Sequence, residues 1–203
     1  VAREIDAELL EIETGELENS GYAANSANRC YFCKSELYSR LKPLAIERGT
    51  PFILNGTHRD DLGDWRPGLK AAEEYGVQSP LVEADFTKEE VREAAKTIGL
   101  STWSKPQAAC LSSRIPFGTS VTRERLAQVE EGEEVLKGVG FREVRLRWFG
   151  KTARIEVGRD ETEIFFRNTA VREKTLGGLK ALGFEAIDLC LEGYRSGRFN
   201  PSS

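Results

Sequence analysis

Two cysteines with a pair of aromatic residues between them are the first residues in this sequence that could carry out chemistry. Cys30 and Cys33 stand three positions apart in the stretch NRCYFCKSELY, residues 28–38. In a turn or a short helix, two thiols at this spacing can point at one atom, which suits a metal site or a redox-active disulfide. The spacing alone favours neither use.

An acidic loop forms a second candidate site. The stretch PFILNGT, residues 51–57, is typical of a short apolar strand, and HRDDLGDWRPG follows it directly. Open α/β sheets bind ligands where a strand ends in such a loop. Asp60, Asp61 and Asp64 are therefore candidates for holding Mg²⁺ or ribose hydroxyls, and a solvated acidic turn is the alternative.

A pair of arginines forms a third candidate site. Arg145 and Arg147 alternate with apolar residues in EVRLRW, so both side chains are expected on one face of a strand. Neighbouring guanidinium groups repel each other unless an anion or carboxylates lie between them. A phosphate is the preferred partner, and pairing with carboxylates such as Glu133 is the alternative.

Cys110 lies in a long irregular stretch that joins the two halves of the chain. Residues 101–122 are rich in Ser, Pro and Gly, which indicates either a linker or a functional loop. Two serines and Arg114 follow Cys110 closely. The fourth cysteine, Cys190, lies in an alternating apolar stretch and is expected to be a small buried hydrophobe.

The first half of the chain is expected to alternate helices and strands, as parallel sheets do. Thr87 and Glu90 form a capping box that predicts the start of one helix. The sequence contains no Met and opens inside an α/β unit, so we expect a first strand upstream of Val1. The expected elements are the end of a helix at 1–5, a strand at 8–12, a helix at 35–49, a strand at 51–57 and a helix at 87–99.

The second half of the chain is expected to form a smaller α+β domain. Its apolar periodicity changes from helical to alternating after residue 140, which indicates strands. The expected elements are a helix at 123–138, strands at 141–149 and 152–158, a helical region at 160–182 and a strand at 185–192.

The composition favours a folded protein without a broad nucleic-acid-binding surface. Hydrophobic residues make up 39% of the 203 positions, enough to bury a core, and the net charge of -4 argues against broad nucleic-acid binding. Four cysteines are too few for a disulfide-stapled secreted fold. No apolar run approaches the roughly 20 residues of a membrane span. We expect a soluble cytoplasmic protein that binds neither nucleic acid nor membrane.

Five motifs together resemble one known family. They extend over nearly the whole chain and are similar to those of the ATP-dependent sulfur transferases that help make the nickel-pincer nucleotide cofactor of lactate racemase. The motifs are NRCYFCKSELY, NGTHRDDLGDWRPGLKAA, SKPQAACLSSRIPFGT, VRLRWFGKTARIEV and LEGYRSGRFN.

The resemblance implies a fold and a reaction. The fold is a parallel-sheet α/β domain of the PP-loop ATP pyrophosphatase type, over 1–104, followed by the smaller sulfur-transfer domain over 105–203. The first domain is N-terminally incomplete, because the family's phosphate-gripping Ser-Gly-Gly-x-Asp-Ser loop is absent. This sequence is therefore not expected to adenylate a substrate by itself, whereas the full-length protein is. The reaction uses ATP and Mg²⁺ to convert a ring carboxylate of pyridinium-3,5-dicarboxylate mononucleotide into an acyl-adenylate, which a protein-held sulfur converts into a thiocarboxylate. A homo-oligomer, often a hexamer, is also implied.

The source of the sulfur differs between branches of that family. In one branch the cysteine that matches Cys110 gives up its own sulfur and ends as dehydroalanine. In a three-cysteine branch, Cys30, Cys33 and Cys110 would anchor a [4Fe-4S] cluster with one iron open to hydrosulfide. The presence of all three cysteines favours the cluster. The alternatives are sacrificial chemistry at Cys110 and a structural zinc, for which His58 is the only available histidine.

The residue types and the resemblance together define the candidate site residues. Cys110 and Glu133 are the candidates for catalysis, with Glu133 orienting arginines or assisting proton transfer. Tyr31 or Phe32 could stack on a nucleotide ring, although aromatic residues more commonly pack in a core. The candidates for nucleotide and phosphate binding are Tyr31, Asn55, Gly56, Thr57, Asp61, Asp64, Arg66, Ser113, Arg114, Arg145 and Arg147, with Arg195 and Ser196 as further candidates unless the tail is merely solvated.

Two other classes of protein stay open from the sequence. A tRNA-thiolating PP-loop enzyme can also use three cysteines and a cluster, although the acidic composition and the lack of basic stripes weigh against it. A non-enzymatic metal-binding module would hold zinc and leave no open coordination position.

Overall fold

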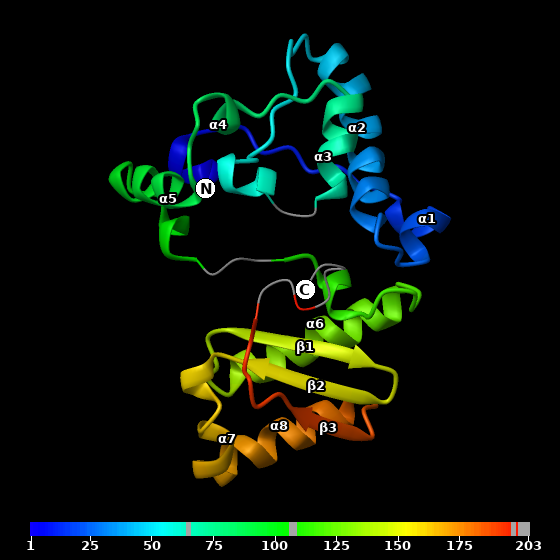
Figure 1. Ribbon diagram of the computed structural model, residues 1–203, viewed down its shortest axis with the longest axis vertical. Coiled ribbons are helices and arrows are strands. Elements are labelled where there is room, and N and C mark those ends of the chain that lie inside the picture. Colours follow the sequence, from blue (N-terminus) through cyan, green and yellow to red (C-terminus); the bar gives the residue numbers. More distant parts are fainter. Residues whose placement is uncertain (64–65, 106–108, 196–197, 199–203) are drawn as a thin grey trace. The chain divides into compact units, whose positions relative to one another are not determined.

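The chain divides into two compact units (Figure 1). The computed structural model describes residues 1–63, 66–105, 109–195 and 198. The first unit combines Val1–Tyr22 with Asn28–Gln107, and the second combines Ala23–Ala27 with Ala108–Ser203. The chain is mixed α/β, as predicted, and the strands that form a sheet all lie in the second unit.

The first unit is mainly helical in its described part. Helix α2 packs against α3 around a small core that includes Tyr38, Ala71, Ala72 and Val77. No helix in the described ranges is long and apolar enough to cross a membrane. The helices are α1 (Ser20–Ala23, at the boundary between the units), α2 (Arg29–Glu47), α3 (Pro67–Glu74), α4 (Pro80–Glu83) and α5 (Lys88–Thr97).

The predicted alternation of strands and helices in this half is wrong for the described residues. The expected strand at 8–12 forms no strand, and of the strand expected at 51–57 only Leu54 pairs, in a single parallel bridge with Gln78. A strand is stable when ladder hydrogen bonds extend on its flanks. Leu54 has only this bridge among the described residues, and its side chain is 57% exposed. The parallel sheet of a PP-loop domain therefore stays a prediction.

The helix boundaries of this unit follow local sequence signals more closely. Thr87 and Glu90 form the predicted capping box at the start of α5, with the Thr87 side chain accepting from Glu90 N–H. Gly49 and Gly99 adopt positive φ after their helices, as expected for glycine at a helix end. The prediction placed the start of the first long helix at residue 35, whereas α2 begins at Arg29.

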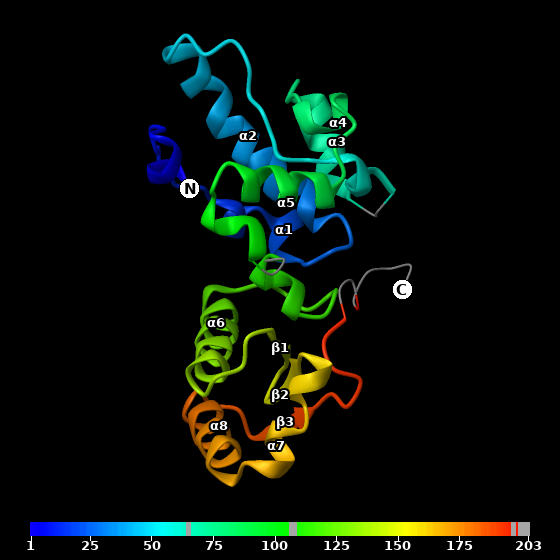
Figure 2. The ribbon, with the colours of Figure 1, turned by 90° about the vertical axis from the view of Figure 1, so that its left-hand side faces the viewer.

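The second unit is a three-stranded sheet covered on one side by two helices. In the strand order β1-β2-β3, β1 and β2 are antiparallel, and β2 and β3 are parallel. Figure 2 shows α6 and α8 on the same side of the sheet. These elements confirm the predicted order of the second half: α6 (Arg123–Gly138), β1 (Val144–Phe149), β2 (Thr152–Val157), α7 (Ile164–Arg167), α8 (Thr169–Ala181) and β3 (Ala186–Leu189).

The two faces of the sheet differ in chemistry. Val144, Leu146 and Ile155 point into the apolar core beneath the helices. Because side chains alternate along a strand, Arg145 and Arg147 of β1 lie on the opposite face, as predicted. Arg145 and Arg147 are nevertheless buried, at 7% and 4% exposure. Other parts of the second unit must therefore cover this charged face.

A short upstream segment completes the second unit. Asn25, from Ala23–Ala27, is fully buried, and its side-chain amide donates to the carbonyl oxygens of Ile115 (3.2 Å) and Pro116 (2.8 Å). The backbone N–H of Gly118 in turn donates to the Asn25 carbonyl oxygen. Asn25 therefore fixes the turn that follows Arg114.

Gly132 allows α6 to lie close against β1. A Cβ atom at this position would collide with Leu146 Cδ2 and lie 3.2 Å from Leu179 Cδ2, both in the core. We expect Gly132→Ala to lower the free energy of unfolding by about 1–3 kcal/mol, because overpacking outweighs the higher helix propensity of alanine. Urea denaturation measures this difference, with Gly138→Ala, where a Cβ would meet nothing within 4 Å, as the control. If Gly132→Ala left the free energy of unfolding unchanged, the core would be shown to relax around the added methyl group.

Candidate functional site

A cavity of about 340 Å³ lies between α2, α3 and the acidic loop in the first unit. Cys30 and Lys34, both from α2, line it together with Arg66 and Asp61. The predicted loop residues Asn55, Gly56 and Thr57 also line it. Much of the predicted nucleotide-binding set in this unit therefore surrounds one cavity.

Cys30 and Cys33 are the second and fifth residues of α2, at its N-terminal end. Residues three apart on a helix are neighbours on its surface, so both thiols lie on one side of α2. Cys30 is exposed and Cys33 is half-buried. The positive end of the helix dipole at this terminus suits negatively charged thiolate ligands.

Lys34 was missed in the sequence analysis. It follows Cys30 by one helical turn, and this (i, i+4) spacing was the available signal. Gly68 of α3 approaches α2 so closely that a Cβ there would lie 3.0 Å from Lys34 Cγ. The contact limits where the Lys34 side chain can lie, while its ammonium group is 5.9 Å from the centre of the Tyr38 ring.

The predicted aspartates of the acidic loop have different partners. Asp61 is buried, and its Oδ1 lies 2.7 Å from Arg66 Nη2 and 3.5 Å from His58 Nε2. Asp60 instead accepts a hydrogen bond from the backbone N–H of Lys88 at 2.8 Å. The third predicted aspartate, Asp64, lies outside the described residues.

Asn55 shapes the loop at the cavity. Its side-chain oxygen accepts hydrogen bonds from the backbone N–H of Thr57 (3.0 Å) and from the Ser79 hydroxyl (2.9 Å). The first contact is a local side-chain turn that asparagine commonly forms. The loop conformation beside the cavity is therefore fixed by its own sequence.

Tyr31 packs against the core of the first unit. Its ring contacts Phe32 edge to face, with centroids 5.6 Å apart, and its hydroxyl donates to Glu74 Oε2 at 2.6 Å. The Glu74 carboxylate raises the pKa of Tyr31 above its usual range by accepting this hydrogen bond, which favours the protonated hydroxyl. These contacts correspond to core packing, the alternative that the sequence left open for Tyr31. Its stacking on a nucleotide ring stays a prediction.

In the second unit, Arg114 holds the backbone that carries Cys110. Cys110 is exposed and directly precedes the 3₁₀ helix Leu111–Arg114. Arg114 Nη1 donates to the carbonyl oxygens of Ala109 (2.7 Å) and Cys110 (3.0 Å) and to the Ser113 hydroxyl (3.2 Å). One buried guanidinium group thus fixes the backbone that carries an exposed thiol.

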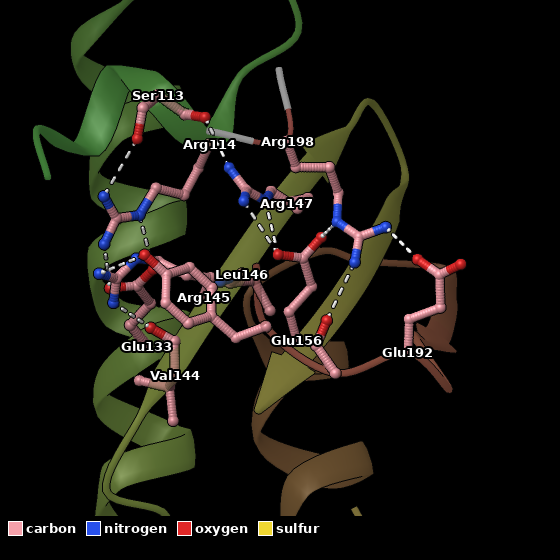
Figure 3. Close-up of polar contacts among 12 residues, drawn as sticks. Ser113, Arg114, Glu133, Val144, Arg145, Leu146, Arg147, Glu156, Glu192 and Arg198 are labelled. Carbon is pink, nitrogen blue, oxygen red and sulfur yellow. Dashed lines mark hydrogen bonds and ion pairs between the residues drawn. The ribbon is translucent and has the colours of Figure 1, made fainter. Parts of the chain in front are cut away.

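Glu133 of α6 is the carboxylate partner of Arg114. Arg114 Nε and Nη2 donate to the two Glu133 oxygens at 2.8 and 3.1 Å, and both side chains are buried (Figure 3). Glu133 Oε1 also accepts the backbone N–H of Leu146 at 3.1 Å. The prediction that Glu133 orients an arginine of this set agrees with these contacts.

Arg147 pairs with Glu156, a residue that sequence reasoning missed. Arg147 Nε and Nη2 donate to Glu156 Oε2 at 3.1 and 2.9 Å, and Arg147 Nη1 donates to the Ser113 carbonyl oxygen at 2.8 Å. Glu156 has no exposed surface. The alternative of carboxylate pairing therefore holds for Arg147, with Glu156 in place of Glu133. The signal was the alternation of TARIEV, which places Glu156 directly opposite Arg145.

The tail after β3 also reaches this face. Arg145 Cζ lies 4.6 Å from the centre of the Tyr194 ring, and Arg198 Nε lies 3.0 Å from Glu156 Oε1. The second contact is an ion pair rather than an aligned hydrogen bond. Of the two predicted tail residues, Arg195 is exposed and Ser196 lies outside the described residues.

The cysteines form no disulfide. Cys30 and Cys33 belong to the first unit and Cys110 to the second, so a cluster with three thiolate ligands stays a prediction. Across the described ranges, no three His, Cys, Asp or Glu side chains gather into a metal-binding group. Cys190, predicted to be buried, is half-buried.

Comparisons with known proteins extend these findings. No protein-family model matches the sequence. The chain is 42% identical to the uncharacterized protein slr1717 of Synechocystis sp., over 93% of its own length and 70% of that protein. It is 37% identical to the pyridinium-3,5-bisthiocarboxylic acid mononucleotide synthase of Lactiplantibacillus plantarum, over 98% of its own length and 71% of the synthase. It is also 31% identical to the uncharacterized protein MJ0830 of Methanocaldococcus jannaschii, over 85% of its own length and 66% of that protein.

These similarities extend across both units of the chain. Because the chain covers more than two thirds of the Lactiplantibacillus plantarum enzyme, it belongs to the family of pyridinium-3,5-bisthiocarboxylic acid mononucleotide synthases. The family predicted from the five motifs is thereby confirmed. Its PP-loop fold and its three-cysteine branch stay predictions.

Proposed function

We propose that this protein inserts sulfur into the ring carboxylates of a pyridinium-3,5-dicarboxylate mononucleotide at the expense of ATP. The observation that carries the proposal is the exposed Cys110 thiol, which lies next to a backbone segment that buried Arg114 and Arg147 hold through its carbonyl oxygens. The positive charge of these arginines would attract an anionic substrate toward the segment that carries the sulfur atom. The identity with the bisthiocarboxylic acid mononucleotide synthase supports the same reaction.

The reaction must first make a carboxylate electrophilic. Attack of a carboxylate oxygen on the α-phosphorus of ATP releases pyrophosphate and gives an acyl-adenylate, whose AMP is a good leaving group. A sulfur nucleophile then forms the C–S bond, and the C–O bond to AMP breaks. With hydrosulfide as the nucleophile the product is a thiocarboxylate. With the Cys110 thiol it is a thioester, and β-elimination then removes the Cα proton and breaks the Cβ–Sγ bond of Cys110, which releases the thiocarboxylate and leaves dehydroalanine. Repetition on the second ring carboxylate, which in the second case needs a second protein molecule, gives the bisthiocarboxylate.

In this proposal the arginine face binds the substrate phosphate. Arg145 and Arg147 come from adjacent same-face positions of β1, and Ser113 stands beside Arg114 and Arg147 through the contacts described above. Guanidinium groups bind phosphate with paired hydrogen bonds. Arg147 donates to Glu156 and to the Ser113 carbonyl oxygen, and these contacts restrict the rotation of its guanidinium group.

The cavity of the first unit suits the activation step. Lys34 and Arg66 bring positive charge to its wall, and Asp61 and Asn55 supply oxygen atoms. We propose that the first unit, as part of a PP-loop type of domain, binds ATP and Mg²⁺ at this cavity. The second unit then receives the activated substrate.

Cys30, Cys33 and Cys110 have the donor chemistry for a [4Fe-4S] cluster. Two of the thiols are neighbours on α2, and Cys30 and Cys110 are exposed, as ligands of an external group must be before it binds. When bound, such a cluster with three protein ligands would supply sulfide from its open iron. In the absence of a cluster, the Cys110 thiol itself is the proposed sulfur donor.

The test compares the affinity of the protein for the dicarboxylate mononucleotide and for its dephosphorylated riboside. For Arg147→Ala we expect about a ten- to hundredfold loss of affinity for the mononucleotide, because charge-assisted hydrogen bonds to phosphate are lost, and little change for the riboside. Isothermal titration calorimetry measures both affinities. Arg167→Ala, which removes an exposed arginine paired with Glu163, is the matched control.

Two outcomes would contradict the proposed binding mode. One is an equal loss for both ligands, which would show that Arg147 only maintains the fold. The other is full retention of mononucleotide affinity in a correctly folded Arg147→Ala protein, which would remove the arginine face from the substrate site.

A further inference from the structure

The chain after β3 continues alongside β2. The backbone N–H of Cys190 donates to the Ile155 carbonyl oxygen at 2.9 Å, and that of Tyr194 donates to the Val157 carbonyl oxygen at 2.8 Å. Gly193 lies between them with φ 71°, and a Cβ there would be 3.0 Å from the Val157 carbonyl oxygen. A glycine is therefore required for the tail to lie this close to β2.

Tyr194 places an aromatic ring against Arg145. The guanidinium carbon is 4.6 Å from the ring centre, within the range of a cation–π contact, and Arg145 Nη2 lies 3.5 Å from the Tyr194 hydroxyl. Arg145 Nη1 also donates to the Val144 carbonyl oxygen at 2.7 Å. The ring and the carbonyl together restrict the rotamer of Arg145.

Arg198 acts on the neighbouring arginine through Glu156. Glu156 is fully buried and offers one oxygen to Arg147 and the other to Arg198 (Figure 3). Arg198 is held in turn by Glu192 Oε2 at 2.9 Å and by the Gly193 carbonyl oxygen at 3.0 Å. The Arg198 side chain is only 17% exposed, so it belongs to the packed face rather than to solvent.

This arrangement changes the charge that the face presents. Within the triad Arg147–Glu156–Arg198, two guanidinium groups share one carboxylate, which leaves one positive charge in excess. Glu192 offsets it only in part, because its side chain is 74% exposed and solvent screens it. Without Arg198, the negative charge of Glu156 would cancel the positive charge of Arg147, and no excess positive charge would remain in this group.

We propose that Tyr194 and Arg198 form a C-terminal clasp that positions Arg145 and Arg147 and keeps the net charge of their face positive for the substrate phosphate. The clasp rests on the proposed function, because it gives these arginines the role described above. Tyr194 and Arg198 act as positioning residues: each sets the geometry of an arginine of β1 without contacting the reacting atoms.

The test uses the phosphate-dependent affinity ratio, which is the dissociation constant of the riboside divided by that of the mononucleotide. For Arg198→Ala we expect this ratio to fall about tenfold, because a misdirected and more fully neutralised Arg147 binds phosphate less well. Arg198→Lys should restore part of the ratio, since it keeps the charge but lacks the fork that reaches Glu156 and Glu192 together. Arg167→Ala again serves as the control, with no expected change.

Two gentler variants keep the test decisive if Arg198→Ala does not fold. Glu192→Gln removes the outer anchor of Arg198 and should lower the ratio about two- to threefold, because at this largely exposed position the loss of positioning outweighs the small gain in net positive charge. Tyr194→Leu should lower it by a similar factor through the loss of the ring contact with Arg145. Both proteins are expected to keep their affinity for the riboside.

The outcomes separate the clasp from the proposed function. If Arg147→Ala lowers the ratio and the folded clasp variants leave it unchanged, the clasp is refuted and the phosphate site stands. If neither Arg147→Ala nor the clasp variants change the ratio, both ideas fail. A parallel loss of riboside affinity in the clasp variants would assign the tail a purely structural role and also overturn the clasp.

Discussion

Replacing Cys110 by alanine is expected to lower thiocarboxylate formation by about a thousandfold or more, because the variant removes the sulfur atom on which both proposed routes depend. Mass spectrometry of the mononucleotide after incubation with ATP and a sulfide source measures this product. The Cys190→Ala protein is the matched control, since Cys190 is a cysteine that neither proposed route uses, and its activity should equal that of the unaltered chain. Full activity in Cys110→Ala would exclude Cys110 from the reaction.

The same experiment distinguishes the two sources of sulfur. In the sacrificial route, β-elimination at Cys110 leaves dehydroalanine, so the protein loses one hydrogen sulfide in mass and turns over once. In the cluster route, anaerobically purified protein contains iron and acid-labile sulfide, and Cys33→Ala loses both together with repeated turnover. Metal-free protein with the mass loss at Cys110 would remove the cluster from the proposal.

Replacing Glu133 by alanine is expected to lower the free energy of unfolding by about 3–5 kcal/mol, because Arg114 would be left charged and buried without its bidentate partner. The Leu146 N–H would lose its acceptor as well. Such a loss is a large part of the roughly 5–15 kcal/mol that stabilises a typical protein. Chemical denaturation followed by far-ultraviolet circular dichroism measures it.

Glu134→Ala, at the next position in the chain, is the control for Glu133→Ala. Glu134 also lies on α6 but is exposed and pairs with Lys137 at 2.6 Å, so Glu134→Ala should change stability by less than about 1 kcal/mol. A Glu133→Ala protein as stable as Glu134→Ala would show that water or a shifted side chain compensates Arg114. The Cys110 loop would then owe its position to contacts other than the buried pair.

Local signals in the sequence predicted the second unit well. The alternation of EVRLRW placed Arg145 and Arg147 on one face of β1, and the strands and helix α6 lie where periodicity put them. These features depend on neighbouring residues, for which side-chain period is a strong signal. The capping box at Thr87 belongs to the same class of local feature.

Features that depend on distant partners were not predictable in this way. Arg114 meets Glu133 across 19 positions and Asn25 meets Pro116 across 91, and no periodicity links such pairs. The strand expected at 51–57 failed for the same reason, since a strand requires partners that apolar sequence alone does not guarantee. Glu156 was overlooked because its importance comes from two arginines on other segments.

The segment Ala23–Ala27 makes the second unit discontinuous in sequence. Residues on both sides of this segment belong to the first unit, so the chain passes from one unit to the other at three places rather than one. A single cut in the stretch after residue 104 would therefore not yield two independent proteins. A fragment of residues 105–203 would lack the buried Asn25 amide, and the turn at Ile115 and Pro116 would lose the side chain that fixes it. The loop that carries Cys110 therefore depends for its conformation on a segment from the N-terminal half of the chain.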